Sequence, residues 1–303
     1  MKKLRTAAMP GSLILPPLDD TMRLLREVSI NTSIYRGARG GSWEVLSCRH
    51  TLKESHLLYL MNEYIASTYG DHLADVYDDW FDTVDEAAID RLAELAAGGR
   101  ALELGIGTGR VALPLAARGT EVHGIDASEA MVSKLRRRPG AESINVSMGN
   151  FADVQAVGEF RLIFVVFNTF FGLVTQEEQV RCFQNVAAHL GQGGTFVIEV
   201  FVPDMNRFSG GQELRTREVT TEHVSLQASL HDPVSQRVKS QYIVFSNNRV
   251  NNYPVEIRYC WPSELDLMAQ LGGLRLRHRW SNWNKGEFNA TSEKHISVYE
   301  RAG

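Results

Sequence analysis

The sequence has few cysteines and lacks a long apolar run near its start. Three cysteines, Cys48, Cys182 and Cys260, are scattered over 303 residues. Their odd number and wide spacing match neither a disulfide framework nor a zinc-ligand motif, which favours a reducing, cytoplasmic compartment and no bound metal. The apolar stretch at residues 13–15 is followed by two prolines, so it is too short for a signal sequence or a membrane span.

An excess of charge of either sign is also lacking. The formal net charge is −4 and the sequence pI is about 6.2. Because proteins that bind nucleic acid usually carry a basic surface, this balance argues against a nucleic-acid partner. The chain is long enough for one large domain or two small ones, with a sizeable core.

What the sequence does have is a glycine-rich turn between two short apolar runs. Residues 101–104 are apolar apart from Glu103, and Gly105, Gly107 and Gly109 follow at alternate positions. A helical segment then leads to a second run that ends at Asp126. A strand, a glycine turn, a helix and a strand ending in an acid form a nucleoside-binding crevice at the carboxyl ends of parallel strands. Glycine suits the turn because it tolerates positive φ and lets a ligand approach the backbone.

The spacing of the glycines bears on which nucleoside is bound. A dinucleotide fingerprint requires glycine at its first, third and sixth positions, and the sixth position here is Arg110. A long side chain there would crowd a pyrophosphate or disturb the close contact between helix and strand. The pattern therefore disfavours a nicotinamide-dependent oxidoreductase.

The run Glu-Leu-Gly-Ile-Gly-Thr-Gly, residues 103–109, resembles the first motif of the class I methyltransferases that use S-adenosylmethionine. The closest resemblance is to small-molecule enzymes of bacterial natural-product pathways and to amino-sugar and glycine N-methyltransferases, and it covers residues 57–300. It implies an α/β fold with a Rossmann-like sheet of seven strands, S-adenosyl-L-methionine as the cofactor, and methyl transfer to an oxygen, nitrogen or carbon atom of a small-molecule acceptor such as a secondary metabolite.

The resemblance also implies roles for individual residues. Glu103 would face the ammonium of the cofactor's methionine part, Asp126 would accept both ribose hydroxyls, and Met131 would lie under the adenine. The alternatives are that Glu103 caps a loop, that Asp126 caps the next helix and that Met131 belongs to the core. Asn150 stands where relatives carry an acid that accepts the adenine amino group, and an amide carbonyl can do the same. The predicted cofactor contacts are Glu103, Gly105, Gly107, Gly109, Asp126, Ala127, Met131, Asn150, Phe151 and Phe167.

Two segments are expected to border the acceptor. Residues 57–81 are rich in aromatic and acidic side chains, and there Tyr77 either walls the methyl-transfer pocket or packs its helix onto the domain. Phe81 stands where amino-sugar N-methyltransferases often carry tyrosine, which argues against that substrate. After the fourth strand, Asn168 is expected to orient the acceptor. Tyr77 and Asn168 are thus the candidate catalytic residues, and no histidine is placed as a general base.

A period-two pattern follows the fifth strand. Three strands are expected at residues 219–230, 238–245 and 253–259, within a ribbon over residues 205–261 that resembles a lid inserted in the methyltransferase sheet. The lid is expected to cover the acceptor, and it is a candidate surface for a homodimer. Its candidate acceptor contacts, each alternatively a solvated strand residue, are His223, His231, Arg237, Tyr242 and Arg258.

The expected layout is a methyltransferase domain over residues 57–303 after a loosely ordered extension over residues 1–56. Residues 20–28 suit one or two helical turns, and Met61 precedes the apparent start of the domain, so the first sixty residues are predicted to be dispensable. Further helices are expected at 82–97, 127–138, 175–190 and 263–271, and further strands at 144–148, 162–167, 195–201, 274–280 and 295–299.

Two other functions remain open from the sequence. One is a protein that binds S-adenosylmethionine without transferring the methyl group, as a regulator or a pericyclase-like catalyst. The other is an RNA methyltransferase, against which the net charge argues. The fourth motif also lacks the paired prolines that nucleobase amine methyltransferases carry there.

Overall fold

The computed structural model describes residues 28–37, 43–52, 64–81, 83–246 and 249–303. The chain divides into two units, residues 1–63 and residues 64–303. In the first unit, β1 (Val28–Gly37) pairs with β2 (Trp43–Leu52) in an antiparallel hairpin that the sequence analysis did not assign. The expected helical turns at residues 20–28 fall outside the described residues except for Val28, which begins β1.

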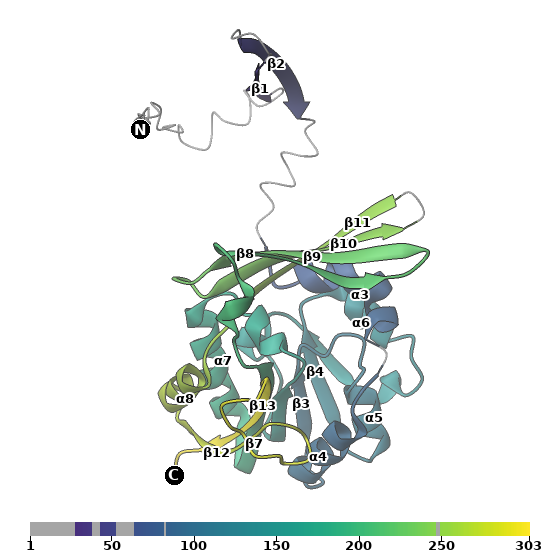
Figure 1. Cartoon of the computed structure of the whole chain (residues 1–303). Helices are drawn as coiled ribbons and strands as arrows, with labels where there is room; N and C mark the ends of the chain where they lie inside the picture. The colour runs from purple at the N-terminus through teal and green to yellow at the C-terminus, as the bar shows by residue number, and fades with distance from the viewer. Residues whose placement is uncertain (1–27, 38–42, 53–63, 82, 247–248) are drawn as a thin grey trace, which may run out of the picture. The chain divides into compact units, whose positions relative to one another are not determined.

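The second unit is built on a seven-stranded sheet (Figure 1). The strand order is β12-β13-β7-β6-β3-β4-β5, and all neighbours are parallel except the two pairs that β13 makes. The strands are β3 (Ala101–Leu104), β4 (Val122–Asp126), β5 (Asn145–Met148), β6 (Phe160–Val165), β7 (Leu190–Phe201), β12 (Leu274–Trp280) and β13 (Lys294–Arg301). This order confirms the predicted α/β, Rossmann-like sheet with one antiparallel strand inserted near its edge.

Helices cover both faces of this sheet (Figure 1). They are α3 (Thr68–Trp80), α4 (Glu86–Ala96), α5 (Ala112–Ala117), α6 (Glu129–Leu135), α7 (Gln176–His189) and α8 (Pro262–Leu271). One apolar cluster joins the sheet to α7 and α8, and a second joins it to α4 and α5. Short 3-10 turns η1 to η4 lie at Ala141–Ser143, Phe151–Asp153, Thr169–Gly172 and Met205–Arg207. None of the helices in the described ranges combines the length and hydropathy needed to cross a bilayer.

Several helix starts differ from the sequence prediction. The helix expected from residue 82 begins at Glu86, after Asp85, whose side chain accepts the backbone N–H of Ala87. The helix expected from residue 127 begins after Ser128, whose hydroxyl accepts the backbone N–H of Met131. Asp126 is therefore not its N-cap. The last helix begins at Pro262 after Trp261, which offers no side-chain cap, rather than after Ser263. By contrast, α7 begins next to residue 175, as predicted, with a capping box in which the side chains of Thr175 and Glu178 accept each other's backbone N–H.

The lid is a separate sheet with four strands in the order β11-β10-β9-β8, one more than predicted. The strands are β8 (Gln212–Val219), β9 (His223–Asp232), β10 (Arg237–Ser246) and β11 (Arg249–Arg258). The predicted strand at 219–230 joined the end of β8 to β9, because the tight turn at Thr220 carries no glycine or proline. There the Thr220 hydroxyl accepts the backbone N–H groups of Glu222 and His223. Figure 1 shows the lid lying across one end of the central sheet, beside α3 and α6.

Candidate active site

A cavity of about 470 Å³ lies between the lid and the carboxyl ends of the parallel strands. Its floor is formed by residues that follow β3, β4, β5 and β6, α3 forms a side, and lid strands form its roof. The predicted site residues that line it are Gly105, Gly107, Asp126, Ala127, Met131, Asn150, Phe151, Phe167, Tyr77 and Asn168. Glu103 and Gly109 lie behind this wall, and no lining atom belongs to them.

The glycine turn has the backbone that its sequence predicts. Gly105, Gly107 and Gly109 have φ values of +73°, +56° and +78°. Residues with a side chain rarely adopt such positive φ values. A Cβ on Gly109 would lie 2.2 Å from Cδ1 of Leu135, so this glycine allows the turn to pack against α6. A Cβ on Gly107 would meet nothing within 4 Å, which leaves its backbone open to the cavity.

The Asp126 side chain faces this turn. Its carboxylate accepts the N–H of Gly107 at 2.7 Å through Oδ2 and the N–H of Ser128 at 2.8 Å through Oδ1. Burial raises the pKa of Asp126 above its ordinary value, and the backbone hydrogen bonds counteract this rise. The carboxylate is thus fixed at the end of β4 with lone pairs to spare, because each oxygen accepts one of these bonds.

Glu103 and Arg110 lie near each other at the turn, and the charge of Arg110 acts on the Glu103 carboxyl. Glu103 is 4% exposed, and its Oε2 has no hydrogen-bond partner among the described residues. Burial raises the pKa of Glu103 well above its ordinary value, although the positive charge of Arg110 lowers it. The Arg110 guanidinium lies 3.9 Å from the centre of the Phe167 ring and donates to the carbonyl oxygen of Phe81 at 3.1 Å.

The side chain of Asn150 is already bonded within the protein. Its Oδ1 accepts the N–H of Ala152 at 2.9 Å, and its Nδ2 donates to Glu178 at 3.0 Å. The amide therefore fixes the turn η2 and holds α7. Phe151, which follows it, and Met131, which is 3% exposed, complete this part of the cavity wall.

The segment after β6 has an unusual backbone. Phe167 and Asn168 have φ values of +55° and +68°, and both line the cavity. Glu199 on β7 holds them, because its carboxylate accepts the N–H of Phe167 at 3.3 Å and its carbonyl accepts that of Asn168 at 3.1 Å. Asn168 Oδ1 accepts the N–H of Phe201 at 2.7 Å, so the side-chain carbonyl is occupied while its NH2 group has no bond to a described residue.

Helix α3 is fastened to the loops beneath it. Asp78 accepts the hydroxyl of Thr108 at 2.7 Å, and Asp71 accepts the hydroxyl of Ser128 at 2.7 Å. Tyr77 lines the cavity, where its hydroxyl accepts a bond from Arg110 at 3.4 Å. Burial raises the pKa of Tyr77, so its hydroxyl is protonated at neutral pH. Trp80 instead packs edge-on against Tyr242 and Tyr253 of the lid, as a packing residue would.

Comparison with known proteins shows the family. A family model described as a methyltransferase domain matches residues 101–194. The structure of the CcbJ methyltransferase from Streptomyces caelestis is 39% identical in sequence, and the match covers 79% of this chain and 100% of that chain with a TM-score of 0.75. The chain is an S-adenosylmethionine-dependent methyltransferase.

More distant structures share the methyltransferase fold. CalS10 from Micromonospora echinaspora, an amino pentose methyltransferase involved in calicheamicin biosynthesis, was solved with S-adenosylmethionine bound; it is 21% identical, with 80% of this chain and 99% of that chain covered and a TM-score of 0.57. The sugar N-methyltransferase KedS8 from a Streptoalloteichus species is 18% identical, with 78% and 98% covered and a TM-score of 0.56. A search of curated proteins found no match.

Of the five lid residues named as acceptor contacts, only Tyr242 lines the cavity of the methyltransferase. His223 pairs with Glu218 at 2.9 Å, Arg237 pairs with Glu256, and His231 contacts the Tyr259 hydroxyl at 3.0 Å. Within the described residues, no cluster of His, Cys, Asp and Glu side chains is arranged to hold a metal ion.

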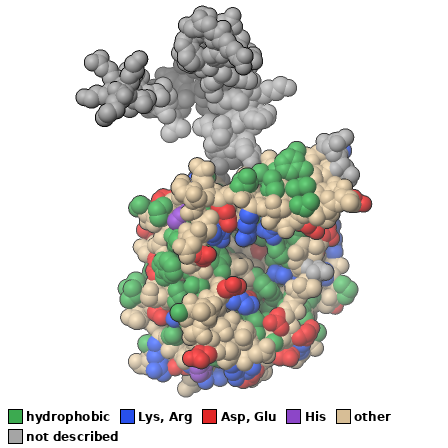
Figure 2. Space-filling model, in the orientation of Figure 1, with side chains coloured by type: hydrophobic (Ala, Val, Ile, Leu, Met, Phe, Trp, Pro, Cys, Tyr) green, Lys and Arg blue, Asp and Glu red, His purple; other side chains and the backbone are tan. Residues whose placement is uncertain are grey.

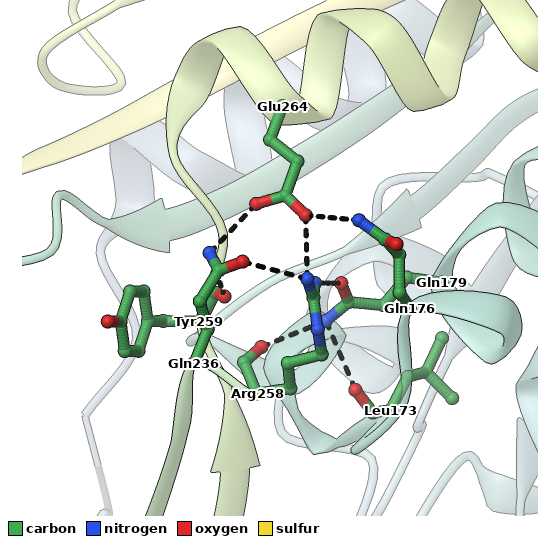
Figure 3. Close-up of polar contacts among 7 residues, drawn as sticks. All are labelled: Leu173, Gln176, Gln179, Gln236, Arg258, Tyr259 and Glu264. Atoms are coloured by element: carbon green, nitrogen blue, oxygen red, sulfur yellow. Dashed lines mark hydrogen bonds and ion pairs between the residues drawn. The ribbon is translucent and has the colours of Figure 1, made fainter. Parts of the chain in front are cut away.

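Arg258 is buried in a network of polar side chains at the base of the lid (Figure 3). Its guanidinium donates to Gln179 at 2.5 Å, to Gln236 at 3.0 Å and to Glu264 at 2.7 Å. Gln179 in turn donates to the carbonyl oxygens of Leu173 at 3.1 Å and Arg258 at 2.8 Å. Because Leu173 lines the cavity, the network fixes one end of the lid to the loop that follows β6.

The structure adds lining residues that the sequence analysis did not single out. They are chiefly Arg110, Arg207, Arg215, Arg217, Gln227 and Ser240. Arg110 was noticed only as a departure from a dinucleotide motif. Arg207, Arg215 and Arg217 lie on or beside β8, the lid strand that the sequence prediction missed. Gln227 and Ser240 lie on β9 and β10, which were predicted as strands, but the prediction did not say which of their residues face the cavity.

Proposed function

We propose that this methyltransferase transfers a methyl group to an oxygen, nitrogen or carbon atom of a small-molecule acceptor held beneath the lid. The observation that carries the proposal is that one cavity joins the glycine turn and Asp126 to the inner face of an inserted sheet. CalS10 is an amino pentose methyltransferase and KedS8 is a sugar N-methyltransferase, which supports a small-molecule acceptor here as well.

The residues at the floor of the cavity, and Glu103 directly behind it, fit S-adenosylmethionine. Glu103 Oε2 is buried without a donor among the described residues, and the cofactor's ammonium would supply one. Gly107 leaves open space above its Cα, where a ligand can approach the backbone. An unpaired buried carboxylate is costly unless a partner occupies the site, so these features agree with a bound cation.

In this proposal each floor residue has a role. Glu103 would hold the ammonium, Arg110 would hold the carboxylate of the methionine part, and Asp126 would accept hydrogen bonds from the ribose hydroxyls. Met131 and Phe151 enclose the adenine, with Asn150 fixing the turn that carries Phe151. The bound cofactor supplies an electrophilic methyl group on a sulfonium.

On the acceptor side, the residues position the substrate and exclude water. The Asn168 NH2 group is free to donate to a polar atom of the acceptor, and the Tyr77 ring, whose face attracts cations, borders the same space. Holding two reactants in line can contribute roughly 7–11 kcal/mol at the well-aligned limit. We further propose that the protein works in the cytoplasm, with neither a nucleic acid nor a membrane as partner.

The test is methyl transfer with an Asp126→Ala variant. We expect S-adenosylhomocysteine to form, by mass spectrometry, when S-adenosylmethionine and a panel of small-molecule acceptors are supplied. Asp126→Ala should weaken cofactor binding by about 1–3 kcal/mol, because charge-assisted hydrogen bonds to the ribose are lost.

The matched control for this test is Asp75→Ala. The Asp75 side chain is 97% exposed on α3, and its one ion pair among the described residues is with Lys134. Its loss should leave the cofactor affinity, measured by calorimetry, unchanged. Equal affinities for the wild type and Asp126→Ala would contradict the assignment of Asp126. Cofactor binding without transfer to any acceptor of the panel would favour the non-transferring alternative.

A further inference from the structure

The inner face of the lid is polar on one side of the cavity and apolar on the other. Alternation along β9 places Ser225, Gln227 and Ser229 on one face, and all three are buried. Ser229 shares a hydrogen bond of 2.8 Å with Ser240 on β10, and Gln227 and Ser240 line the cavity. Towards β11 the lining residues include the apolar Val238, Val255 and Ile257, with the charged Glu256 between the last two. A sheet face that only covered a core would be apolar throughout.

Two arginines extend the polar side of this roof. Arg215 and Arg217 lie on β8, and both line the cavity. Arg215 donates to Gln227 Oε1 at 3.1 Å. Arg217 occupies the register shift between Thr216 and Glu218, and its guanidinium lies 4.3 Å from the centre of the Tyr242 ring. A bulge of this kind redirects a side chain, and here the side chain contacts a ring at the cavity.

Neither arginine forms an ion pair with a carboxylate among the described residues. The neighbouring Arg207 shows the contrast, because it pairs with Glu213 at 2.7 Å. Both cations are thus held by neutral partners, an amide and a ring. Figure 2 shows Lys and Arg side chains gathered just below the lid.

The other charged residues that line the cavity do not neutralise this pair. Glu256 pairs with Arg237 and with Lys239, and Asp126 is bonded at the cofactor turn. Asp204 caps η4 by accepting the N–H of Asn206 at 2.9 Å and leaves one exposed carboxylate on the wall. The roof therefore retains an excess of positive charge.

We propose that Arg215 and Arg217 bind an acidic group of the acceptor, a carboxylate or a phosphate, while Val238, Val255 and Ile257 contact its apolar part. Two guanidinium groups match the oxygens of such a group and bind it through charge-assisted hydrogen bonds. The pair selects and orients the acceptor and takes no part in the chemistry. This inference rests on the proposed function, because it needs the acceptor to lie beneath the lid.

The test uses matched pairs of probe molecules, each a carboxylic acid and its primary amide on an aromatic or aliphatic frame, with hippurate and hippuramide among them. Affinities are measured by calorimetry or saturation-transfer NMR on the full chain saturated with S-adenosylhomocysteine. In the wild type, at least one acid should bind about tenfold or more tightly than its amide. Added salt should weaken binding of that acid.

The variant Arg215→Gln/Arg217→Gln should lose this preference while its affinity for S-adenosylhomocysteine stays unchanged. The control is Arg275→Gln/Arg277→Gln on the edge strand β12, where both arginines pair with Glu300; it should keep the preference. The inference is overturned if no acid binds better than its amide, or if the β8 variant retains the preference. If the wild type did not bind S-adenosylhomocysteine, the proposed function itself would be refuted.

Discussion

Glu103 is a buried acid for which the described part of the protein supplies no donor to one oxygen, Oε2. Its carboxyl is buried beside Asp126, with Arg110 as the opposing charge. The resemblance of the motif predicts that Glu103 faces the cofactor. The motif does not show that one oxygen lacks a partner, because this depends on which donors the folded chain brings near.

Replacing Glu103 by glutamine should stabilise the cofactor-free protein relative to the wild type, and the difference should increase with pH. Burial raises the pKa of Glu103 above its ordinary value of 4.5, so the folded protein favours the protonated acid. The stabilisation that the protonated Glu103 gives the folded wild type is fully present below pH 4.5 and is lost as the pH rises through the raised pKa. The stability advantage of Glu103→Gln over the wild type, measured by urea denaturation, should therefore grow as the pH rises above 4.5.

The same variant should bind S-adenosylmethionine more weakly at neutral pH, because the ammonium loses its counter-charge. Glu129→Gln, an exposed residue in the first turn of α6, serves as the control and should show neither effect. A difference in stability that does not change with pH would contradict the pKa assigned to Glu103.

Other residues show where prediction from the sequence succeeds and where it stops. The positive φ of Gly105, Gly107 and Gly109 follows from their spacing, since only glycine adopts such a turn freely. The bond between Asn150 and Glu178 joins residues 28 positions apart. Nothing local in the sequence indicates it, so Asn150 was expected to contact adenine while its amide is in fact bonded within the protein.

Among the elements, buried strands were predicted well, whereas β8, an exposed strand of the lid, was missed. Strands β3 and β6 are buried apolar runs, as central parallel strands must be. Strand β8, Gln-Glu-Leu-Arg-Thr-Arg-Glu-Val, lies at the edge of the lid and is mostly exposed, so it has no apolar alternation to detect. The prediction that the lid pairs two subunits remains a prediction.

The polar network at the base of the lid should contribute strongly to stability. Burial would raise the pKa of Glu264, but hydrogen bonds from Arg258, Gln236 and Gln176 outweigh it and lower the pKa. Arg258→Met should cost about 3–5 kcal/mol in the free energy of unfolding, because Glu264 and Gln179 lose the donor between them. The cost is read from urea denaturation.

Arg275→Met is the comparison for this network. Arg275 pairs with Glu300 at 2.6 Å, but its side chain is 64% exposed, so its loss should cost less than about 1 kcal/mol. If both variants lost the same stability, the network at Arg258 would not fix the lid as described.

At the scale of the whole molecule, the unit formed by residues 64–303 contains the sheet, the lid and the cavity. A chain that begins at Met61 should therefore fold and bind S-adenosylhomocysteine as the full chain does. Circular dichroism and calorimetry of the two chains check this. Weaker binding or loss of cooperative unfolding in the shorter chain would show that residues 1–60 are required.

The cavity has a floor from the ends of the central strands and a roof from an insertion between β7 and α8. In the proposed function, the methyl donor is bound by the floor, and the lid supplies contacts to the acceptor from a separate stretch of polypeptide. Substitutions within residues 212–258 can alter which compound is methylated without touching the loops that hold the reagent. The protein can therefore evolve to methylate new acceptors while it continues to use the same methyl donor.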